Sequence, residues 1–312
     1  MHDPQQLYTV DEDVARDLVS RADSGGPGPV LVHMVRGFVD AGSAGQGAAE
    51  HLTERFGAQR LVTFDSDQLV DYRSRRPAMT FSSTHWSEYD EPTLAVDVLR
   101  DLEDVPFLLL HGVEPDVQWE RFVGAVREVV ERFAVPLTVG VHGIPMGVPH
   151  TRPLGITAHA TRPELVEQHT PWFGTVQVPA SVSALLEYRL GSWGHDAMGF
   201  AVHVPHYLVQ SAFPRASQVA LEHVERSTGL ELDTAGLEEA ARDAALEVDR
   251  QVEASEDVSA VVRALEDQYD SFARAIGRTS LLAESTDLPT AEELGEQFER
   301  FLAQQGGDGS GL

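Results

Sequence analysis

The residues best suited to chemistry lie in a glycine-rich loop, residues 36–47, between a predicted strand and a predicted helix. The apolar run at residues 30–35 follows a turn rich in Gly and Pro, a pattern typical of a buried strand. The loop reads RGFVD and then AGSAGQG, which opens the helix. Ligands often bind at such a junction, because free backbone N–H groups and the positive helix end point there. The alternative is structural: small residues let a helix pack closely on a sheet.

Ser43 is the candidate nucleophile in this loop. Residues 41–45, AGSAG, resemble a loosened nucleophile elbow, and Asp and His residues further along the chain could complete a triad. Five loop residues separate the strand from this turn, however, whereas an elbow needs a sharp bend. We therefore expect Ser43 to be a helix-start residue. The order of Gly42, Gly45 and Gly47 differs from G-x-G-x-x-G, which argues against a dinucleotide site.

A second candidate site is the loop at residues 149–153, PHTRP. Its two prolines stiffen the backbone, and His150 and Arg152 suit a carboxylate or a phosphate group. The alternative is a rigid connector whose arginine pairs with an acidic side chain of the same chain. His203 and His206 are three residues apart at a strand end, which places them on opposite faces and disfavours joint metal binding.

The composition excludes several classes of chemistry. The chain has no cysteine, and all 23 of its basic residues are arginine, so disulfides, thiolate nucleophiles, a Walker lysine and a Schiff-base lysine are all excluded. The net charge of −27 argues against nucleic acid and anionic membranes as partners. No apolar run approaches the length of a membrane span, and the N-terminus is acidic and polar. We expect a cytoplasmic protein with no cofactor and no metal.

Strand and helix signals alternate along residues 1–230, which we predict to be one domain. The predicted strands and helices of its main part are 60–64, 105–110, 119–133, 135–141, 179–190, 198–204 and 216–227. This alternation predicts an α/β core with a mostly parallel sheet and helices on both faces. We also predict a short strand at residues 77–81 and a hairpin near residues 93–100.

The C-terminal part of the chain carries helix signals and no strand signal. Residues 231–305 are predicted to be a helical region, with helices at 233–276 and 290–304, and residues 306–312 a disordered tail. From Leu221 to the end there are 22 Asp and Glu against 7 Arg. We expect a narrow apolar stripe to pack on the core and an acidic face to point outward, either as a solvated surface or as a docking surface for a basic partner.

Five motifs in register resemble the proteasome assembly chaperone 2 family in its actinobacterial form. They are GFVDAGSAGQGAAEHL, FDSDQLVDYRSRRPAM, LLLHGVEPDVQW, VPHTRP and VPHYL, and the resemblance covers about residues 7–302. It implies an α/β core related to the nucleoside-phosphorylase-like fold, a C-terminal helical region, self-association and a chaperone-like role without catalysis. Some chaperones of this kind end in a hydrophobic-Tyr-any tripeptide that docks in proteasomal ring pockets. This chain ends GSGL, so we do not expect docking by that route.

The resemblance also marks motif residues that are candidates for ligand binding or interaction. They are Gly37, Asp40, Gly42, Arg76, His111, Glu114, His150, Arg152, His206 and Tyr207.

The sequence therefore predicts an interaction protein that forms a closed homo-oligomer, with a trimer favoured, and whose partners include proteasome subunits or another protein. The competing hypothesis is an enzyme. It would be a serine hydrolase built on Ser43, or a nucleoside-phosphorylase-like enzyme that uses the loops at 36–47 and 149–153. An enzyme needs polar groups that converge on a pocket, whereas an interaction protein does not.

Overall fold

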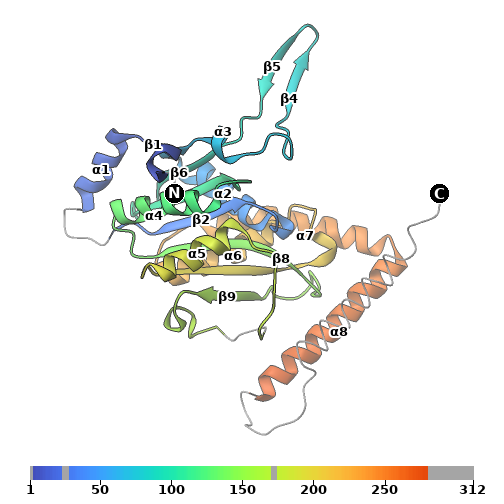
Figure 1. The fold of residues 1–312 in the computed structure, drawn as a ribbon. Coiled ribbons are helices and arrows are strands. Elements are labelled where there is room, and N and C mark those ends of the chain that lie inside the picture. The colour runs from blue at the N-terminus through green and yellow to red at the C-terminus, as the bar shows by residue number, and fades with distance from the viewer. Residues whose placement is uncertain (1–2, 23–27, 170–173, 280–312) are drawn as a thin grey trace.

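A computed structural model describes residues 3–22, 28–169 and 174–279 of the chain. It contains a large sheet between two layers of helices, and a two-stranded hairpin that stands clear of this body (Figure 1). The strands are β1 (Tyr8–Val10), β2 (Leu31–Arg36), β3 (Gln59–Phe64), β4 (Met79–Ser82), β5 (His85–Tyr89), β6 (Leu94–Arg100), β7 (Pro106–Val113), β8 (Thr138–Met146), β9 (Ile156–Ala160) and β10 (Ala197–Pro205). The α-helices are α1 (Glu12–Ala22), α2 (Ala44–Phe56), α3 (Ser66–Leu69), α4 (Trp119–Arg132), α5 (Val182–Ser192), α6 (Pro214–Thr228), α7 (Glu238–Glu253) and α8 (Glu256–Thr279).

The main sheet has the strand order β1-β3-β6-β7-β2-β8-β10-β9. Its four central strands, β7, β2, β8 and β10, run parallel to one another. The outer strands pair antiparallel, including the hairpin of β6 and β7 that the sequence predicts near residues 93–100. The predicted α/β class, with parallel strands at the centre of the sheet and helices after the core, is confirmed. Because the central strands are parallel, their carboxyl ends meet at one edge of the sheet, which we call the carboxyl edge.

The helices cover both faces of this sheet because the buried strands alternate their side chains. Val32 and Leu109 belong to a core cluster with α2 and α6, whereas their neighbours Leu31 and Leu108 belong to a second cluster with α1, α4 and α5. This period of two along apolar strands is what a sheet buried on both faces requires. The result is a three-layer α/β/α sandwich.

The C-terminal helices are held differently from the core helices. The predicted helical run 233–276 is divided into α7 and α8 by a break at residues 254 and 255. Helix α7 packs against α6. Ala241 and Val262 are buried, while most other side chains of the two helices are partly or fully exposed. In Figure 1, α8 extends away from the sandwich. The predicted helix at 290–304 and the predicted tail at 306–312 lie outside the described residues.

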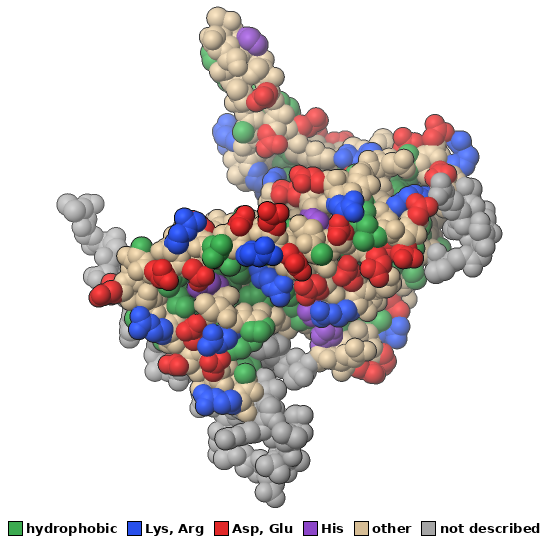
Figure 2. Space-filling model, turned by 180° about the vertical axis from the view of Figure 1, so that it is seen from behind, with side chains coloured by type: hydrophobic (Ala, Val, Ile, Leu, Met, Phe, Trp, Pro, Cys, Tyr) green, Lys and Arg blue, Asp and Glu red, His purple; other side chains and the backbone are tan. Residues whose placement is uncertain are grey.

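The face of the molecule seen in Figure 2 carries both acidic and basic side chains. Figure 2 shows Asp and Glu interspersed with Arg over the body, with the hairpin standing clear of it. Among the helices of the described residues, none has the length and apolar character that a membrane crossing needs.

Candidate interaction site at the carboxyl edge of the sheet

The carboxyl edge gathers most of the candidate residues. Gly37, Asp40 and Gly42 follow β2, and Glu114 follows β7. The loop at 149–153 follows β8, and His206 and Tyr207 follow β10. The fold thus brings to one edge residues that are far apart in the sequence. The contacts of each residue show whether its side chain is available to a ligand or holds parts of the chain together.

Asp40 uses its carboxylate to tie a helix to a strand. Its Oδ1 accepts hydrogen bonds from the backbone N–H groups of Gly45 and Gly143, both at 2.9 Å, and its Oδ2 accepts one from Gln46 at 2.9 Å. Gly45 and Gln46 lie in the first turn of α2, where a negative charge is favourable. The approach of β8 is so close that a Cβ on Gly143 would lie 2.1 Å from the carbonyl oxygen of Ala41. Asp40 is therefore committed to backbone groups of its own chain.

Gly42 joins the same loop to the segment after β10. Its backbone has a φ of +66°, which favours glycine, and a Cβ there would lie 3.0 Å from the Cβ of Phe213. Its N–H donates to the carbonyl of Val209 at 3.1 Å, and its own carbonyl accepts from the N–H of Phe213 at 2.9 Å. Ser43, the residue before α2, also has a positive φ and makes no capping hydrogen bond with its side chain. The loop is a tight connection between elements.

Glu114 is the junction of three segments. It is only 5% exposed, and its Oε1 accepts a hydrogen bond of 2.7 Å from the N–H of Val182, the first residue of α5. Its Oε2 accepts one of 3.1 Å from the N–H of Phe38 and lies 3.9 Å from Arg75. A Cβ on Gly37 would lie 2.6 Å from Oε2, so this glycine lets the carboxylate approach the backbone. We call this arrangement the Glu114 junction.

The Glu114 junction holds the backbone while apolar side chains remain in solvent. Phe38 is 73% exposed, and its neighbour Val39 and Val117 in the loop after β7 are exposed as well. Val176 and Val178, which precede α5, are also exposed. A buried carboxylate bonded to two backbone N–H groups fixes the loops that carry these side chains.

The loop at 149–153 fastens the C-terminal helices. Arg152 makes two hydrogen bonds of 2.9 Å to the carboxylate of Asp270 in α8, and its Nη1 lies 3.3 Å from Glu266. Tyr269 donates to the carbonyl of Pro153 at 3.0 Å. Of the two alternatives from the sequence, these contacts agree with the second, a connector whose arginine pairs with acidic residues of the same chain.

His150 and Tyr207 extend this fastening to α7. The Tyr207 hydroxyl lies 2.6 Å from Nδ1 of His150 and accepts the backbone N–H of His150 at 2.8 Å. Nε2 of His150 lies 3.1 Å from Asp249. Burial raises the pKa of Tyr207 to about 12, so its hydroxyl keeps its proton at neutral pH.

The remaining candidates lie apart from these clusters. His111 faces Asp97 of β6 at 2.7 Å, and Arg60 of β3 bonds the same carboxylate. Burial raises the pKa of Asp97, but the hydrogen bonds from His111 and Arg60 outweigh it, so the pKa is lowered overall. His206 is partly buried, which lowers its pKa, and Arg76 is exposed before β4.

A buried histidine, His33 in β2, was not singled out by the sequence. Its ring lies over Gly140 of β8, where a Cβ would come within 2.5 Å of it. Burial, followed by the nearby His142 and His159, lowers the pKa of His33 to about 3. No spacing rule marks this residue, because its burial depends on glycine in a neighbouring strand.

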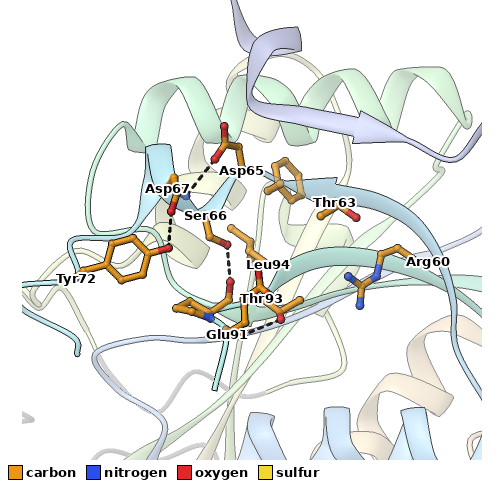
Figure 3. Close-up of a pocket in the computed structure, with 11 residues that line it drawn as sticks. Arg60, Thr63, Asp65, Ser66, Asp67, Tyr72, Glu91, Thr93 and Leu94 are labelled. Carbon is orange, nitrogen blue, oxygen red and sulfur yellow. Dashed lines mark hydrogen bonds between the residues drawn. The ribbon is translucent and has the colours of Figure 1, made fainter. Parts of the chain in front are cut away.

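A pocket of about 320 Å³ lies elsewhere, beside the root of the hairpin. It is lined by Arg60, Thr63, Phe64, Asp65, Ser66, Asp67, Tyr72, Glu91, Pro92, Thr93 and Leu94 (Figure 3), and none of the ten candidate residues is among them. Its polar groups bond one another: Tyr72 donates to Asp67 at 2.7 Å, and Ser66 donates to the carbonyl of Pro92 at 2.6 Å. Asp65 accepts from the N–H of Asp67 at the start of α3. These contacts brace the hairpin root.

The described residues contain no group of three or more His, Asp or Glu side chains placed to hold a metal ion. The ten candidate residues thus divide between backbone ties, the fastening of the C-terminal helices and separate positions outside both clusters. The sequence missed the partners of Asp40 and Glu114, because those partners are backbone groups as far as 103 residues away in the chain.

Comparisons with known proteins agree with this architecture. The sequence model described as "PAC2 family" matches residues 34–252. A Mycobacterium tuberculosis protein of unknown function, Rv2714, is 49% identical, with 81% of this chain and 88% of that chain covered and a TM-score of 0.78. A Corynebacterium glutamicum protein of unknown function is 34% identical, with 86% and 99% covered and a TM-score of 0.79. No curated protein matches the chain significantly.

A more distant solved structure has the same fold. The Mycobacterium tuberculosis proteasome-assembly chaperone homologue Rv2125 is 24% identical, with 75% of this chain and 99% of that chain covered and a TM-score of 0.69.

Proposed function

This chain belongs to the PAC2 family, and from that premise we propose that it is a non-catalytic, chaperone-like protein that binds a protein partner at the carboxyl edge of its sheet. In this proposal the chain also associates with itself and works in the cytoplasm. The partner class includes proteasome subunits, by analogy with the proteasome-assembly chaperone homologue that has the same fold.

The observation that carries the proposal is the Glu114 junction. An enzyme needs polar groups that point into a common pocket at this edge. Here the two carboxylates nearest the strand ends, Asp40 and Glu114, accept hydrogen bonds from backbone N–H groups of their own chain. The side chain that the junction leaves in solvent is Phe38, which is 73% exposed. A rigid loop that carries an exposed aromatic side chain suits protein binding, in which aromatic anchors supply much of the energy.

The charge of the molecule is consistent with a protein partner. A net charge of −27 repels nucleic acid phosphates and anionic lipid surfaces, whereas an apolar loop can bury its side chains in a partner regardless of that charge. His150 and Arg152, which would bind phosphate in a phosphorylase-like enzyme, are instead paired with Asp249 of α7 and Asp270 of α8.

A pull-down with the tagged full chain from native lysate, followed by mass spectrometry, tests the proposal. The decisive variant is Phe38→Asp, and the matched control is Leu102→Asp. Leu102 is 53% exposed in the turn between β6 and β7, at the opposite edge of the sheet. We expect Phe38→Asp to lose the captured protein and Leu102→Asp to keep it. Proteasome subunits among the captured proteins would support the finer assignment of the partner.

The opposite results are equally clear. A captured protein that Phe38→Asp retains at wild-type level contradicts binding at the carboxyl edge. A purified chain that hydrolyses an ester or cleaves a nucleoside, with activity removed by a change at Ser43 or Arg152, would replace the proposal with the enzyme hypothesis.

A further inference from the structure

The loops around Phe38 carry a charge balance that differs from that of the rest of the molecule. Three segments meet there: residues 36–40 after β2, the turn at residues 71–76 before β4, and residues 114–117 after β7. We call them together the Phe38 surface. The whole chain has 23 arginines against 50 carboxylates. The Phe38 surface has four of each and so lacks this acidic excess: Arg36, Arg73, Arg75 and Arg76 against Asp40, Asp71, Glu114 and Asp116.

Contacts between the three segments hold them side by side. The N–H of Phe38 donates to Glu114 at 3.1 Å. Arg75 lies 3.9 Å from Glu114 and forms an ion pair of 2.9 Å with Asp116. The turn at residues 71–76 is therefore fixed to the loop after β7, and that loop is fixed to the loop after β2.

The carboxylates of the Phe38 surface accept hydrogen bonds from backbone groups of the chain. Glu114 is only 5% exposed and accepts two, and Asp40 accepts three. The side chain of Asp116 is 16% exposed and accepts one at 2.8 Å from the N–H of Asp71. Asp71 itself is exposed, and its Oδ1 accepts the N–H of Arg73 at 2.9 Å. Three of the four carboxylates are thus partly or fully buried.

Three of the four arginines, in contrast, are exposed. Arg36, Arg73 and Arg76 form no ion pair within the described residues, whereas most other arginines there do. Arg36 is two residues from Phe38, and the other two are within two residues of Arg75. Their Cα atoms therefore lie within about 7 Å of these fixed positions. The charge that this surface offers to a partner is mainly positive, around an exposed aromatic ring.

We propose that the Phe38 surface binds an acidic segment of the partner protein, in which an apolar side chain is flanked by Asp or Glu. This inference deepens the proposed function and rests on it, since it takes Phe38 as the anchor of the contact. The apolar side chain of the segment packs on Phe38 and Val39. Its carboxylates pair with the exposed guanidinium groups, whose planar fork matches a carboxylate.

The spacing of the surface sets the spacing of the segment. Arg36 and Phe38 are two residues apart at the end of a strand, so carboxylates within about two residues of the apolar side chain can reach the guanidinium group. Nucleic acid also pairs with arginine, but its phosphates would extend over the acidic remainder of a molecule whose net charge is −27. A short acidic segment covers only the region where that excess is missing.

Fluorescence anisotropy with the full chain and three labelled peptides tests this inference. The peptides are Glu-Glu-Phe-Leu-Glu-Glu and the same sequence with Gln or with Lys in place of every Glu. We expect the Glu peptide to bind about ten-fold more tightly than the Gln peptide at low ionic strength, because each of three exposed ion pairs contributes about two-fold. The Lys peptide should bind least. The net charge of the molecule alone would give the opposite order.

Charge reversal locates the binding. Arg36→Glu should weaken binding of the Glu peptide by about four-fold, through the loss of one pair and a new repulsion, and leave the Gln peptide unchanged. The matched control is Arg16→Glu, which changes the net charge equally. Arg16 is exposed in α1, whose Asp17 contacts Arg100 at the opposite edge of the sheet. This control should keep the wild-type preference for the Glu peptide.

Four results overturn the inference. They are a Glu peptide that does not bind at millimolar concentration, a Lys peptide that binds more tightly than the Glu peptide, and a preference for Glu that survives in Arg36→Glu. The fourth is a loss of subunits in Arg36→Glu, measured by light scattering, because the surface would then be covered by a second copy of the chain.

The pull-down separates this inference from the proposed function. A captured protein that Phe38→Asp retains contradicts the proposed function. A captured protein that Phe38→Asp loses but Arg36→Glu retains contradicts only the acidic segment. A Glu peptide that binds through Arg36 while the full chain captures no protein supports the acidic segment and contradicts the proposed function.

Discussion

Replacing Glu114 should destabilise the protein more than replacing any exposed carboxylate on its surface. Glu114→Ala leaves two backbone N–H groups without their acceptor, that of Val182 in a buried position and that of Phe38 in a partly buried one. A hydrogen bond to a charged group contributes about 1.5–3 kcal/mol, so the loss of both should lower the free energy of unfolding by about 3–6 kcal/mol. Glu114→Gln keeps one acceptor oxygen and should cost about half as much.

The assay is denaturant unfolding of the full chain, followed by far-UV circular dichroism and tryptophan fluorescence. The matched control is Glu120→Ala, since Glu120 forms an exposed ion pair with Arg189 and its loss should change the unfolding free energy by less than about 1 kcal/mol. If Glu114→Ala unfolds within about 1 kcal/mol of the wild type, the carboxylate does not hold the three segments together. The Glu114 junction would not then fix the Phe38 loop.

Three further predictions follow from the contacts described above. The pKa of His33 is lowered from 6.5 to about 3, so between these pH values the unfolded chain binds a proton that the folded chain does not. The unfolding free energy should therefore fall as the pH is lowered from 6.5 to 3. A His33→Gln variant with the same pH dependence as the wild type over this range would contradict this. Ser43 is expected to remain unlabelled by a fluorophosphonate probe, and labelling that disappears in Ser43→Ala would contradict its assignment as a helix-start residue. Arg152→Ala should speed hydrogen exchange and proteolysis in α8, because the two hydrogen bonds to Asp270 are lost. Arg274→Ala should not, because among the described residues Arg274 hydrogen-bonds Asp270 and Ser271 of its own helix. Equal protection of α8 in both variants would show that other contacts hold it.

The fold class could be predicted because it depends on local patterns. Alternation of apolar runs and amphipathic segments specifies a layered sheet, and the run at residues 105–110 is indeed the buried strand β7. The antiparallel edges were harder, since strand direction at an edge depends on pairing partners and connections instead of composition. Only one strand of the β4–β5 hairpin was predicted. Residues 77–81 gave a strand signal that corresponds to β4, whereas the bulge removes the regular alternation by which β5 could be recognised.

The candidate residues could be located by the sequence but their roles could not be assigned. Asp40, Glu114 and Arg152 occur in motifs, yet each acts on a group 5 to 118 residues away in the chain. For Arg152 the sequence left two alternatives open, a ligand site or an internal ion pair, and only the position of α8 distinguishes them. The domain boundary at residue 230 and the interaction role of the ten residues remain predictions.

Asp40 has a consequence for what this fold can bind. Many α/β proteins leave the first turn of the helix after the leading strand free, and a phosphate diffuses in to meet its N–H groups. Here the corresponding anion is part of the polypeptide and is delivered by the loop itself to the amides of Gly45, Gln46 and Gly143. A covalently attached ligand has a very high effective concentration, and no soluble anion at cellular concentration competes with it. The chain thus supplies its own carboxylate at this position, and the same group ties the loop to α2 and to β8.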